Sequence, residues 1–291
     1  MTTTNELKQL VKEKYGEIAS QSKEQNETSC CGIGCGCATI DEALMAENYS
    51  KLAGYVADAD LGLGCGLPTE YAHIKAGDVV VDLGSGAGND AFIARAVTGA
   101  TGKVIGVDMT EKMIEKARLN AEKMGFNNVE FRHGDIEQLP LSANVADVVV
   151  SNCVMNLVPN KQKAFTETFR VLKPGGHFSI SDIVLVGELP EGLRKSAEMY
   201  AGCISGAIQK DEYLDVIKAA GFTHVEVQKN KKITLPHEIL STYLNEQELA
   251  QVQAGSLGIF SITVYGEKPL APKPASAAAK AACCGEGSSC C

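Results

Sequence analysis

The strongest signal for the fold of this chain is the stretch Val79-Val-Val-Asp82-Leu-Gly84-Ser-Gly86-Ala-Gly88-Asn89. Its β-branched run predicts a buried strand, and the glycines after it predict a tight turn that leads into a helix. Glycine has no side chain, so its backbone approaches a ligand closely, and the helix N-terminus beyond favours a negatively charged group. An ordinary turn also uses glycine, but the order of strand, glycine turn and helix indicates a ligand-binding site.

Polar residues follow three more predicted strands at the points where those strands end. The second strand ends in Asp108, the third leads to Gly134-Asp135-Ile136, and the fourth leads to Ser151-Asn152. In an open parallel sheet these ends meet at one edge, where ligands bind. Asp108 follows the glycine turn by about 20 residues, a spacing typical of an acid that accepts hydrogen bonds from ribose hydroxyls. The glycine spacing differs from the dinucleotide pattern G-x-G-x-x-G, so the set predicts a nucleoside site of another kind.

Strands and helices alternate from residue 78 onward. This alternation predicts an α/β fold, a doubly wound and mostly parallel seven-stranded sheet with helices on both faces. Helices over 6–19 and 41–57 precede it, and an insertion over 229–258 between the last two strands predicts a small accessory unit. We expect strands at 78–83, 103–108, 129–133, 146–151, 177–182, 224–228 and 261–266, and further helices at 89–98, 110–124, 160–172, 191–202, 211–220 and 245–253.

The composition favours a globular protein and disfavours two classes of function. Hydrophobic residues make up 45% of the 291 residues, enough to bury a sizeable core, and the formal net charge is -9. Because phosphate binding needs a basic surface, we expect no nucleic-acid partner. No apolar run approaches the roughly 20 residues that cross a bilayer, and the polar start lacks a signal core. We therefore expect a cytoplasmic protein with no membrane association.

Eleven cysteines without an export signal favour soft-ligand binding or redox chemistry over a static disulfide framework. Three stand alone: Cys65 in a glycine-rich loop, Cys153 directly after Asn152, and Cys203 in a segment after the fifth strand. Taken singly, each is as often a buried small hydrophobe as a ligand. Together they predict thiolates that converge on a thiophilic centre. Zinc would want a fourth ligand or a water, whereas trivalent arsenic takes three sulfurs and keeps its lone pair.

The nucleoside-site residues resemble the motifs of the class I S-adenosylmethionine-dependent methyltransferases. Asp82-Leu-Gly-Ser-Gly-Ala-Gly88 is similar to their first motif, Asp108 to their ribose-binding acid, Asp135-Ile136 to the pair beside the adenine, and Leu172-Lys-Pro-Gly-Gly176 to the turn before their fifth strand. The resemblance covers residues 70–185 and implies a Rossmann-like fold with S-adenosylmethionine as the methyl donor. It implies donor contacts from Asp82, Gly84, Ser85, Gly86, Gly88, Asp108, Met109, Asp135, Ile136 and Asn152.

The single cysteines resemble the arsenic-binding motifs of the arsenite methyltransferases, in the segments Gly64-Cys65-Gly66, Ser151-Asn-Cys153-Val-Met-Asn-Leu-Val-Pro159 and Gly202-Cys203. Tyr15-Gly16 with Cys30-Cys31 downstream resembles the segment that carries the family's fourth functional cysteine. This resemblance covers residues 10–268. It implies that Cys65, Cys153 and Cys203 hold As(III), as arsenite or methylarsenite, while the arsenic lone pair takes the methyl group. It also implies that Cys30 or Cys31 helps to reduce the oxidised arsenic, and that thioredoxin or glutathione resets the resulting disulfide.

This interpretation divides the chain into four parts. They are an N-terminal helical and Cys-rich arsenic-binding segment (1–69), an S-adenosylmethionine-binding domain (70–185), a substrate-binding segment with the accessory unit and the last strands (186–268), and a disordered Cys-ended tail (269–291). We expect the protein to be a monomer with a thioredoxin-type reductant as partner.

Several alternatives stay open on the residues alone. The chain can be a methyltransferase for a small organic acceptor, with structural cysteines, or a soft-metal-binding protein that uses the fold only to bind. Cys35 or Cys37 can replace Cys30 or Cys31 in the redox role. The tail pairs, Cys283-Cys284 and Cys290-Cys291, either capture soft ions or belong to a dispensable tail.

Overall fold

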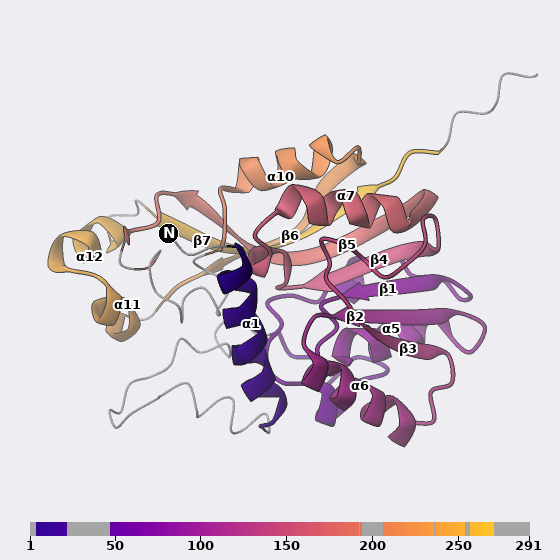
Figure 1. Ribbon diagram of the computed structural model, residues 1–291. Helices are drawn as coiled ribbons and strands as arrows, with labels where there is room; N and C mark the ends of the chain where they lie inside the picture. The colour runs from indigo at the N-terminus through magenta and orange to yellow at the C-terminus, as the bar shows by residue number, and fades with distance from the viewer. Residues whose placement is uncertain are drawn as a thin grey trace, which may run out of the picture.

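The computed structural model describes residues 4–21, 47–191, 193, 206–235, 237–253 and 257–270. Within them a seven-stranded sheet forms the middle layer (Figure 1), and its strands are β1 (Val79–Leu83), β2 (Lys103–Asp108), β3 (Val129–His133), β4 (Ala146–Asn152), β5 (Leu172–Gly187), β6 (Thr223–Ile233) and β7 (Leu257–Glu267). Their order is β3-β2-β1-β4-β5-β7-β6. Strands β1 to β5 pair in parallel, and β7 is antiparallel to both of its neighbours. The predicted doubly wound, mostly parallel seven-stranded sheet is confirmed.

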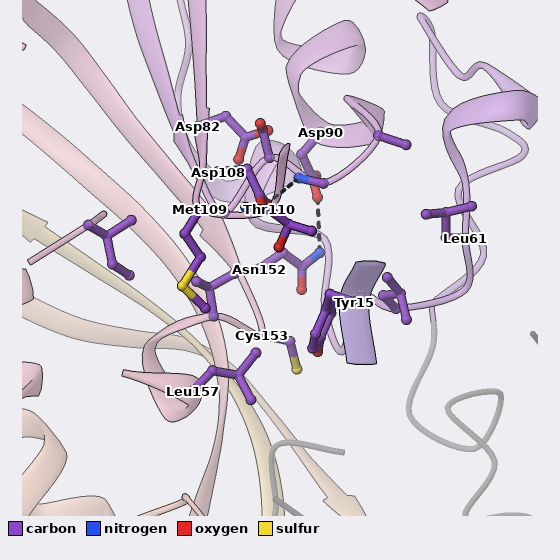
Figure 2. Close-up of a pocket in the computed structure, with 18 of the residues that line it drawn as sticks. Tyr15, Leu61, Asp82, Asp90, Asp108, Met109, Thr110, Asn152, Cys153 and Leu157 are labelled. Atoms are coloured by element: carbon purple, nitrogen blue, oxygen red, sulfur yellow. Dashed lines mark hydrogen bonds between the residues drawn. The ribbon is translucent and has the colours of Figure 1, made fainter. Parts of the chain in front are cut away.

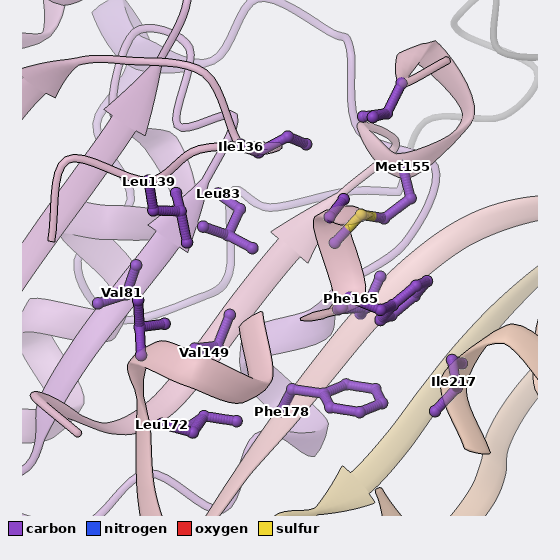
Figure 3. Close-up of a cluster of buried hydrophobic side chains, with 14 of the residues drawn as sticks. Val81, Leu83, Ile136, Leu139, Val149, Met155, Phe165, Leu172, Phe178 and Ile217 are labelled. Atoms are coloured by element: carbon purple, nitrogen blue, oxygen red, sulfur yellow. The ribbon is translucent and has the colours of Figure 1, made fainter. Parts of the chain in front are cut away.

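Helices cover both faces of the sheet because its strands carry apolar side chains on both sides. One face carries α5 (Asn89–Thr98) and α6 (Glu111–Lys123), and the other carries α7 (Lys161–Val171) and α10 (Lys210–Ala219). In β1, Val80 packs with side chains of α5 and α6, whereas Val81 packs with those of α7 and α10, since successive strand residues point to opposite faces. Figure 3 shows the buried apolar cluster on the face covered by α7 and α10, in which the ring centroids of Phe165 and Phe178 lie 6.0 Å apart.

A helix from the N-terminal part lies at the edge where the parallel strands end. This helix, α1 (Thr4–Ala19), packs against α6 (Figure 1). Ile18 and Ala19 at its end are buried with side chains of α5 and α6, and Val11 in its middle is buried near the strand ends. The helix therefore forms a wall beside the carboxyl ends of the strands.

The last three strands are longer than the sequence pattern predicts. β5 begins at Leu172 and ends at Gly187, β6 continues to Ile233, and β7 begins at Leu257. The expected insertion over 229–258 is consequently shorter, and its described helices are α11 (His237–Tyr243) and α12 (Glu246–Gln253). Leu235, Leu240 and Leu244 from this insertion pack on the extended ends of β5 and β7. Local alternation of apolar and polar residues does not predict such a contact between distant segments, and so it does not predict the extended ends of these strands.

The predicted helix over 41–57 is wrong for its described part, residues 47–57. The chain there makes turns, and the short 3₁₀ helix η1 (Ala57–Ala59) follows. Gly54 adopts a φ of +89°, and a Cβ on it would lie 2.6 Å from the carbonyl oxygen of Phe92. Only glycine permits this close packing of the turn on α5. The predicted helix over 191–202 falls almost entirely outside the described residues.

In the described parts of the chain, no helix combines the length and the apolar character needed to cross a membrane. The division of the chain at residues 69, 185 and 268 stays a prediction. Strand β5 continues through residue 185 within the same sheet.

Candidate active site

A pocket opens at the carboxyl ends of β1 to β4, beside β1, where the order of the strands changes direction (Figure 2). Open α/β sheets bind ligands at this position because the connections on the two sides of the switch point leave a crevice there. The pocket contains about 1030 Å³ of empty space, a volume that includes the solvent at its open mouth. Helix α1 closes one side with Lys8, Val11 and Tyr15.

The glycine turn after β1 and the acid at the end of β2 shape the floor of the pocket. Gly86 has a φ of +51°, and nothing lies within 4 Å of a Cβ built on it, so its backbone borders open space. Its N–H donates to Asp108 Oδ2 at 3.0 Å, and the N–H of Thr110 donates to Asp108 Oδ1 at 2.8 Å. These two bonds fix the carboxylate of Asp108 at the pocket floor, where a ligand hydroxyl can reach it.

The predicted donor contacts gather at this pocket with one exception. Gly88 does not line it, because a Cβ there would lie 2.8 Å from the ring of Phe92, so this glycine serves the packing of the turn on α5. The others line the pocket: Asp82, Gly84, Ser85, Gly86, Asp108, Met109, Asp135, Ile136 and Asn152. Their roles in binding the donor stay predictions.

Buried acceptor atoms without a partner mark the pocket wall. Within the described residues, Asp82 Oδ2, Ser85 Oγ, Asn89 Oδ1 and Asp90 Oδ1 have no hydrogen-bond partner. Burial raises the pKa of Asp82 well above its ordinary value, with repulsion from Asp90 and Asp108 adding to it, and burial raises the pKa of Asp90 to about 6. Buried acceptors are costly until a donor or a cation satisfies them. The wall therefore suits a cationic ligand that also donates hydrogen bonds.

Lys8 connects α1 to the loop after β3. Its Nζ lies 2.6 Å from Asp135 Oδ2 and 2.8 Å from Glu137 Oε2. Burial opposes ionisation of Asp135, but the hydrogen bonds from Lys8 and from the backbone of Glu137, together with the charge of Lys8, outweigh it and lower the pKa of Asp135. Among the described residues that line the pocket, Lys8 is the single Lys or Arg. Because its charge is already paired with two carboxylates, the pocket keeps an excess of negative charge.

Cys65 and Cys153, 88 residues apart in the sequence, meet beside the pocket. They form a disulfide with their Cα atoms 5.8 Å apart. Cys153 lines the pocket near Tyr15 and Leu157 (Figure 2), and Cys65 is buried. Cys153 has a φ of +58°, and such a conformation in a residue with a side chain costs on the order of 1–3 kcal/mol and is most common at functional sites. The structure thus brings together two of the three thiols predicted to bind arsenic.

Hydrogen bonds from three strands hold these two cysteines. The N–H of Cys153 donates to the carbonyl of Ser181 in β5 at 2.8 Å, and the hydroxyl of Ser261 in β7 donates to the carbonyl of Cys65 at 2.6 Å. Asn152 at the end of β4 accepts through Oδ1 from the N–H of Cys65 at 3.1 Å and of Gly66 at 3.3 Å. A Cβ on Gly66 would overlap the side chain of Ser181, so glycine is required for the loop to approach β5.

The other predicted cysteines lie outside the described residues, namely Cys30, Cys31, Cys35, Cys37, Cys203 and the tail pairs. Their assigned roles stay predictions. In the ranges that the structure describes, no three His, Cys, Asp or Glu side chains are grouped so as to hold a metal ion.

The sequence pattern does not identify Lys8, Tyr49 or Asp90, although all three line the pocket. Asp90 carries a usable signal, because an acid directly after a glycine turn lies in the first turn of a helix, close to the ligand. Lys8 and Tyr49 carry none. Lys8 bonds to a residue 127 positions away and Tyr49 to one 41 positions away, and no local pattern indicates such contacts.

The sheet order, the glycine turn and Asp108 at the end of β2 together define an S-adenosylmethionine-dependent methyltransferase of class I. A family model described as a methyltransferase domain matches residues 74–221. The pocket suits S-adenosylmethionine chemically, because that molecule carries a sulfonium and an ammonium, and the pocket wall carries unpartnered carboxylate oxygens of Asp82 and Asp90.

Within that class, the chain belongs to the arsenite methyltransferase family. It is 39% identical over 277 residues to the arsenite methyltransferase of Halobacterium salinarum, covering 91% of this chain and 67% of that protein. It is 32% identical over 247 residues to the arsenite methyltransferase of Aquipseudomonas alcaligenes, covering 82% and 69%. The crystal structure of CrArsM, an arsenic(III) S-adenosylmethionine methyltransferase from Chlamydomonas reinhardtii, matches with a TM-score of 0.60 at 32% identity, over 72% of this chain and 68% of that one. The chain thus spans about two thirds of the length of these proteins.

Donor affinity is expected to fall as the pH drops from about 7 to about 5. Asp90, with a pKa of about 6, is ionised at the upper limit and protonated at the lower one, and the cationic donor binds the ionised form more tightly. Each proton that binding must release weakens the apparent affinity by up to about tenfold per pH unit. Calorimetric titration with S-adenosylmethionine across this range measures the effect. Asp90→Asn should bind more weakly at pH 7 with a flatter dependence, and a constant Kd for the parent protein would contradict the assignment.

Proposed function

We propose that this chain transfers methyl groups from S-adenosylmethionine to trivalent arsenic held by cysteine thiolates, in arsenic detoxification. The observation that carries the proposal is the meeting of Cys65 and Cys153 beside the donor pocket. Thiolates suit a soft, thiophilic acceptor better than the oxygen and nitrogen ligands of hard cations do. Family membership supports the same acceptor, because both relatives carry the name arsenite methyltransferase.

Bound S-adenosylmethionine supplies a methyl group that its sulfonium sulfur makes electrophilic. Cys65 and Cys153, with Cys203 as the third ligand, hold As(III) so that its lone pair faces this methyl group. The lone pair forms the As–C bond, and the electron pair of the broken S–C bond stays on sulfur, so the arsenic passes formally from +3 to +5. Rate enhancement then comes from position and orientation, and no group has to remove a proton. In agreement, no histidine lines the described pocket wall.

The donor is held by the acidic residues at the strand ends. Asp108 accepts hydrogen bonds from the ribose hydroxyls, and Asp135 with Ile136 contacts the adenine. Asp82 and Asp90 face the cationic methionine end. The fixed carboxylate of Asp108 and the unpartnered oxygens of Asp82 and Asp90 support this orientation.

Two thiols return the methylated arsenic to +3 by giving up two electrons and forming a disulfide. Cys30 or Cys31, or in their place Cys35 or Cys37, takes part in this step. A thioredoxin or glutathione then opens the disulfide by thiol exchange. The disulfide between Cys65 and Cys153 supports the need for such a reductant, because only a free thiolate binds a metal or arsenic centre.

Methylarsenite serves as a second acceptor after arsenite. One methyl group leaves two bonds on As(III) for thiolates, which the pair Cys65 and Cys153 supplies.

We further propose a monomer that acts in the cytoplasm and has neither a nucleic-acid nor a membrane partner. The formal net charge of -9 supports the absence of a nucleic-acid partner.

The test is incubation with arsenite, a thiol reductant and S-adenosylmethionine, followed by chromatographic separation of arsenic species. We expect methylated arsenic and one S-adenosylhomocysteine for each methyl group transferred. A methyltransferase for an organic acceptor would form no S-adenosylhomocysteine in response to arsenite. A soft-metal-binding protein would bind As(III) stoichiometrically without consuming the donor.

A further inference from the structure

The hydroxyl of Tyr49 lies between the pocket proposed to bind the donor and the loop over residues 61–67 (the Cys65 loop). Tyr49 is 3% exposed. Its hydroxyl oxygen is 2.8 Å from the carbonyl oxygen of Gly66 and 3.1 Å from Asp90 Oδ2, and both of these are acceptors. The amide nitrogen of Asn152 donates to the same hydroxyl. One side chain from outside the sheet thus contacts three elements of the site.

On the thiol side, these bonds fix the backbone next to Cys65. Asn152 Nδ2 donates to the Gly66 carbonyl at 2.8 Å, while Asn152 Oδ1 accepts from the N–H groups of Cys65 and Gly66. A Cβ on Gly64 would lie 2.9 Å from the Tyr49 hydroxyl oxygen, so the loop lies directly against the tyrosine. The Tyr49 hydroxyl and the Asn152 amide therefore hold the Cys65 loop together.

On the donor side, the same hydroxyl and amide meet Asp90 in the first turn of α5. Asp90 Oδ2 lies 3.1 Å from the Tyr49 hydroxyl oxygen, which shares its one proton between this carboxylate and the Gly66 carbonyl, and 3.1 Å from the donor Asn152 Nδ2. Asp90 Oδ1 has no partner among the described residues. α5 begins at the end of the glycine turn. Any movement of this turn therefore reaches the Cys65 loop through Asp90 and the two side chains bonded to it.

We propose that Tyr49 is a positioning residue that sets the distance between the donor and the arsenic-binding thiolate of Cys65. The inference rests on the proposed function and deepens it. Methyl transfer is sensitive to this distance, since a misplacement of about 1 Å costs on the order of 100-fold in rate. Tyr49 acts through Asn152, Gly66 and Asp90, and takes no part in bond making.

The test variant is Tyr49→Phe in the full chain. The ring stays in place because it packs with Leu67 and Ile93, and only the hydroxyl is lost. We expect kcat with arsenite to fall by ~10-fold to ~100-fold, with the Kd of S-adenosylmethionine changed by less than about threefold. The acid limb of the pH profile should also move to higher pH, because the Asp90 carboxylate loses a hydrogen-bond donor.

Tyr213→Phe is the matched control. Tyr213 is fully buried, and its hydroxyl donates to the carboxylate of Asp182 at 3.2 Å, on the α10 side of the sheet. The Tyr213→Phe substitution removes the same kind of hydrogen bond without touching the Cys65 loop, so we expect methylation within about twofold of the parent. An equal loss of kcat in both variants would mean a general loss of stability and would overturn the proposal. So would a Tyr49→Phe variant with parental kcat, or one whose loss lies wholly in donor affinity.

A second measurement needs no arsenic. In the reduced protein, the peptide that contains Cys65 is followed by mass spectrometry during alkylation. We expect severalfold faster labelling in Tyr49→Phe than in the parent and unchanged labelling in Tyr213→Phe. If the parent does not methylate arsenite but this difference appears, the proposed function fails while the loop-holding role of Tyr49 stands. Unchanged labelling in Tyr49→Phe overturns that role.

Discussion

A Cys153→Ser variant is expected to lose arsenite methylation by ~100-fold or more while it binds S-adenosylmethionine within about twofold of the parent. Serine has nearly the shape of cysteine but offers a hard, weakly acidic hydroxyl in place of a soft thiolate, so it does not hold As(III). Cys153 lies on the pocket wall at the end of β4, and no other described thiol reaches that wall. Arsenic speciation measures the loss, and calorimetry measures donor binding.

The control for this variant is its fold under reducing conditions. The Cys65–Cys153 disulfide closes a loop of 88 residues, and loss of such a bridge alone can remove about 4 kcal/mol of stability. Excess thiol opens the disulfide in the parent as well, so that both proteins are compared in the absence of the disulfide. Thermal unfolding should then be similar in both. Methylation at the parental rate would remove Cys153 from the mechanism.

Asp108→Asn is expected to weaken S-adenosylmethionine binding by ~100-fold, equivalent to about 3 kcal/mol. The carboxylate accepts from the N–H groups of Gly86 and Thr110, and in the proposed complex it also accepts from the ribose. An amide has a single acceptor oxygen, and its NH₂ group would face an N–H or a ribose hydroxyl. The substitution therefore disturbs both the glycine turn and the nucleoside. Equilibrium dialysis with labelled donor gives the Kd.

Asp147→Asn is the matched control for that substitution. Asp147 also lies on a strand of the sheet, near the start of β4, and bonds to Lys173 at 2.7 Å and to the N–H of Val79 at 2.9 Å. It lies at the amino-terminal ends of the parallel strands, away from the pocket at their carboxyl ends, so donor affinity should be unchanged within about twofold. A parental Kd in Asp108→Asn would show that the acid at the end of β2 does not bind the ribose.

Local sequence patterns were sufficient for the central sheet and for the floor of the pocket. The run from Val79 to Asn89 encodes a strand, a turn that only glycine can make and a helix start, all from neighbouring residues. Once parallel strands are recognised, the rule that their carboxyl ends share one edge places Asp108, Asp135 and Asn152 together without further information. The positions of Cys65 and of the extended ends of β5 and β7 do not follow from any such rule.

Neighbouring residues specify the class of fold, the glycine turn and the acids at the strand ends, because periodicity and turn chemistry act over a few residues. The pairing of Lys8 with Asp135, the meeting of Cys65 with Cys153 and the contacts of Tyr49 with Gly66 and Asp90 depend instead on long-range packing. These contacts span 17 to 127 positions along the chain and depend on how α1 and the Cys65 loop pack at the carboxyl ends of the strands. Such packing depends on the whole fold, so the sequence neighbours of Lys8, Cys65 and Tyr49 do not predict which residues these side chains contact.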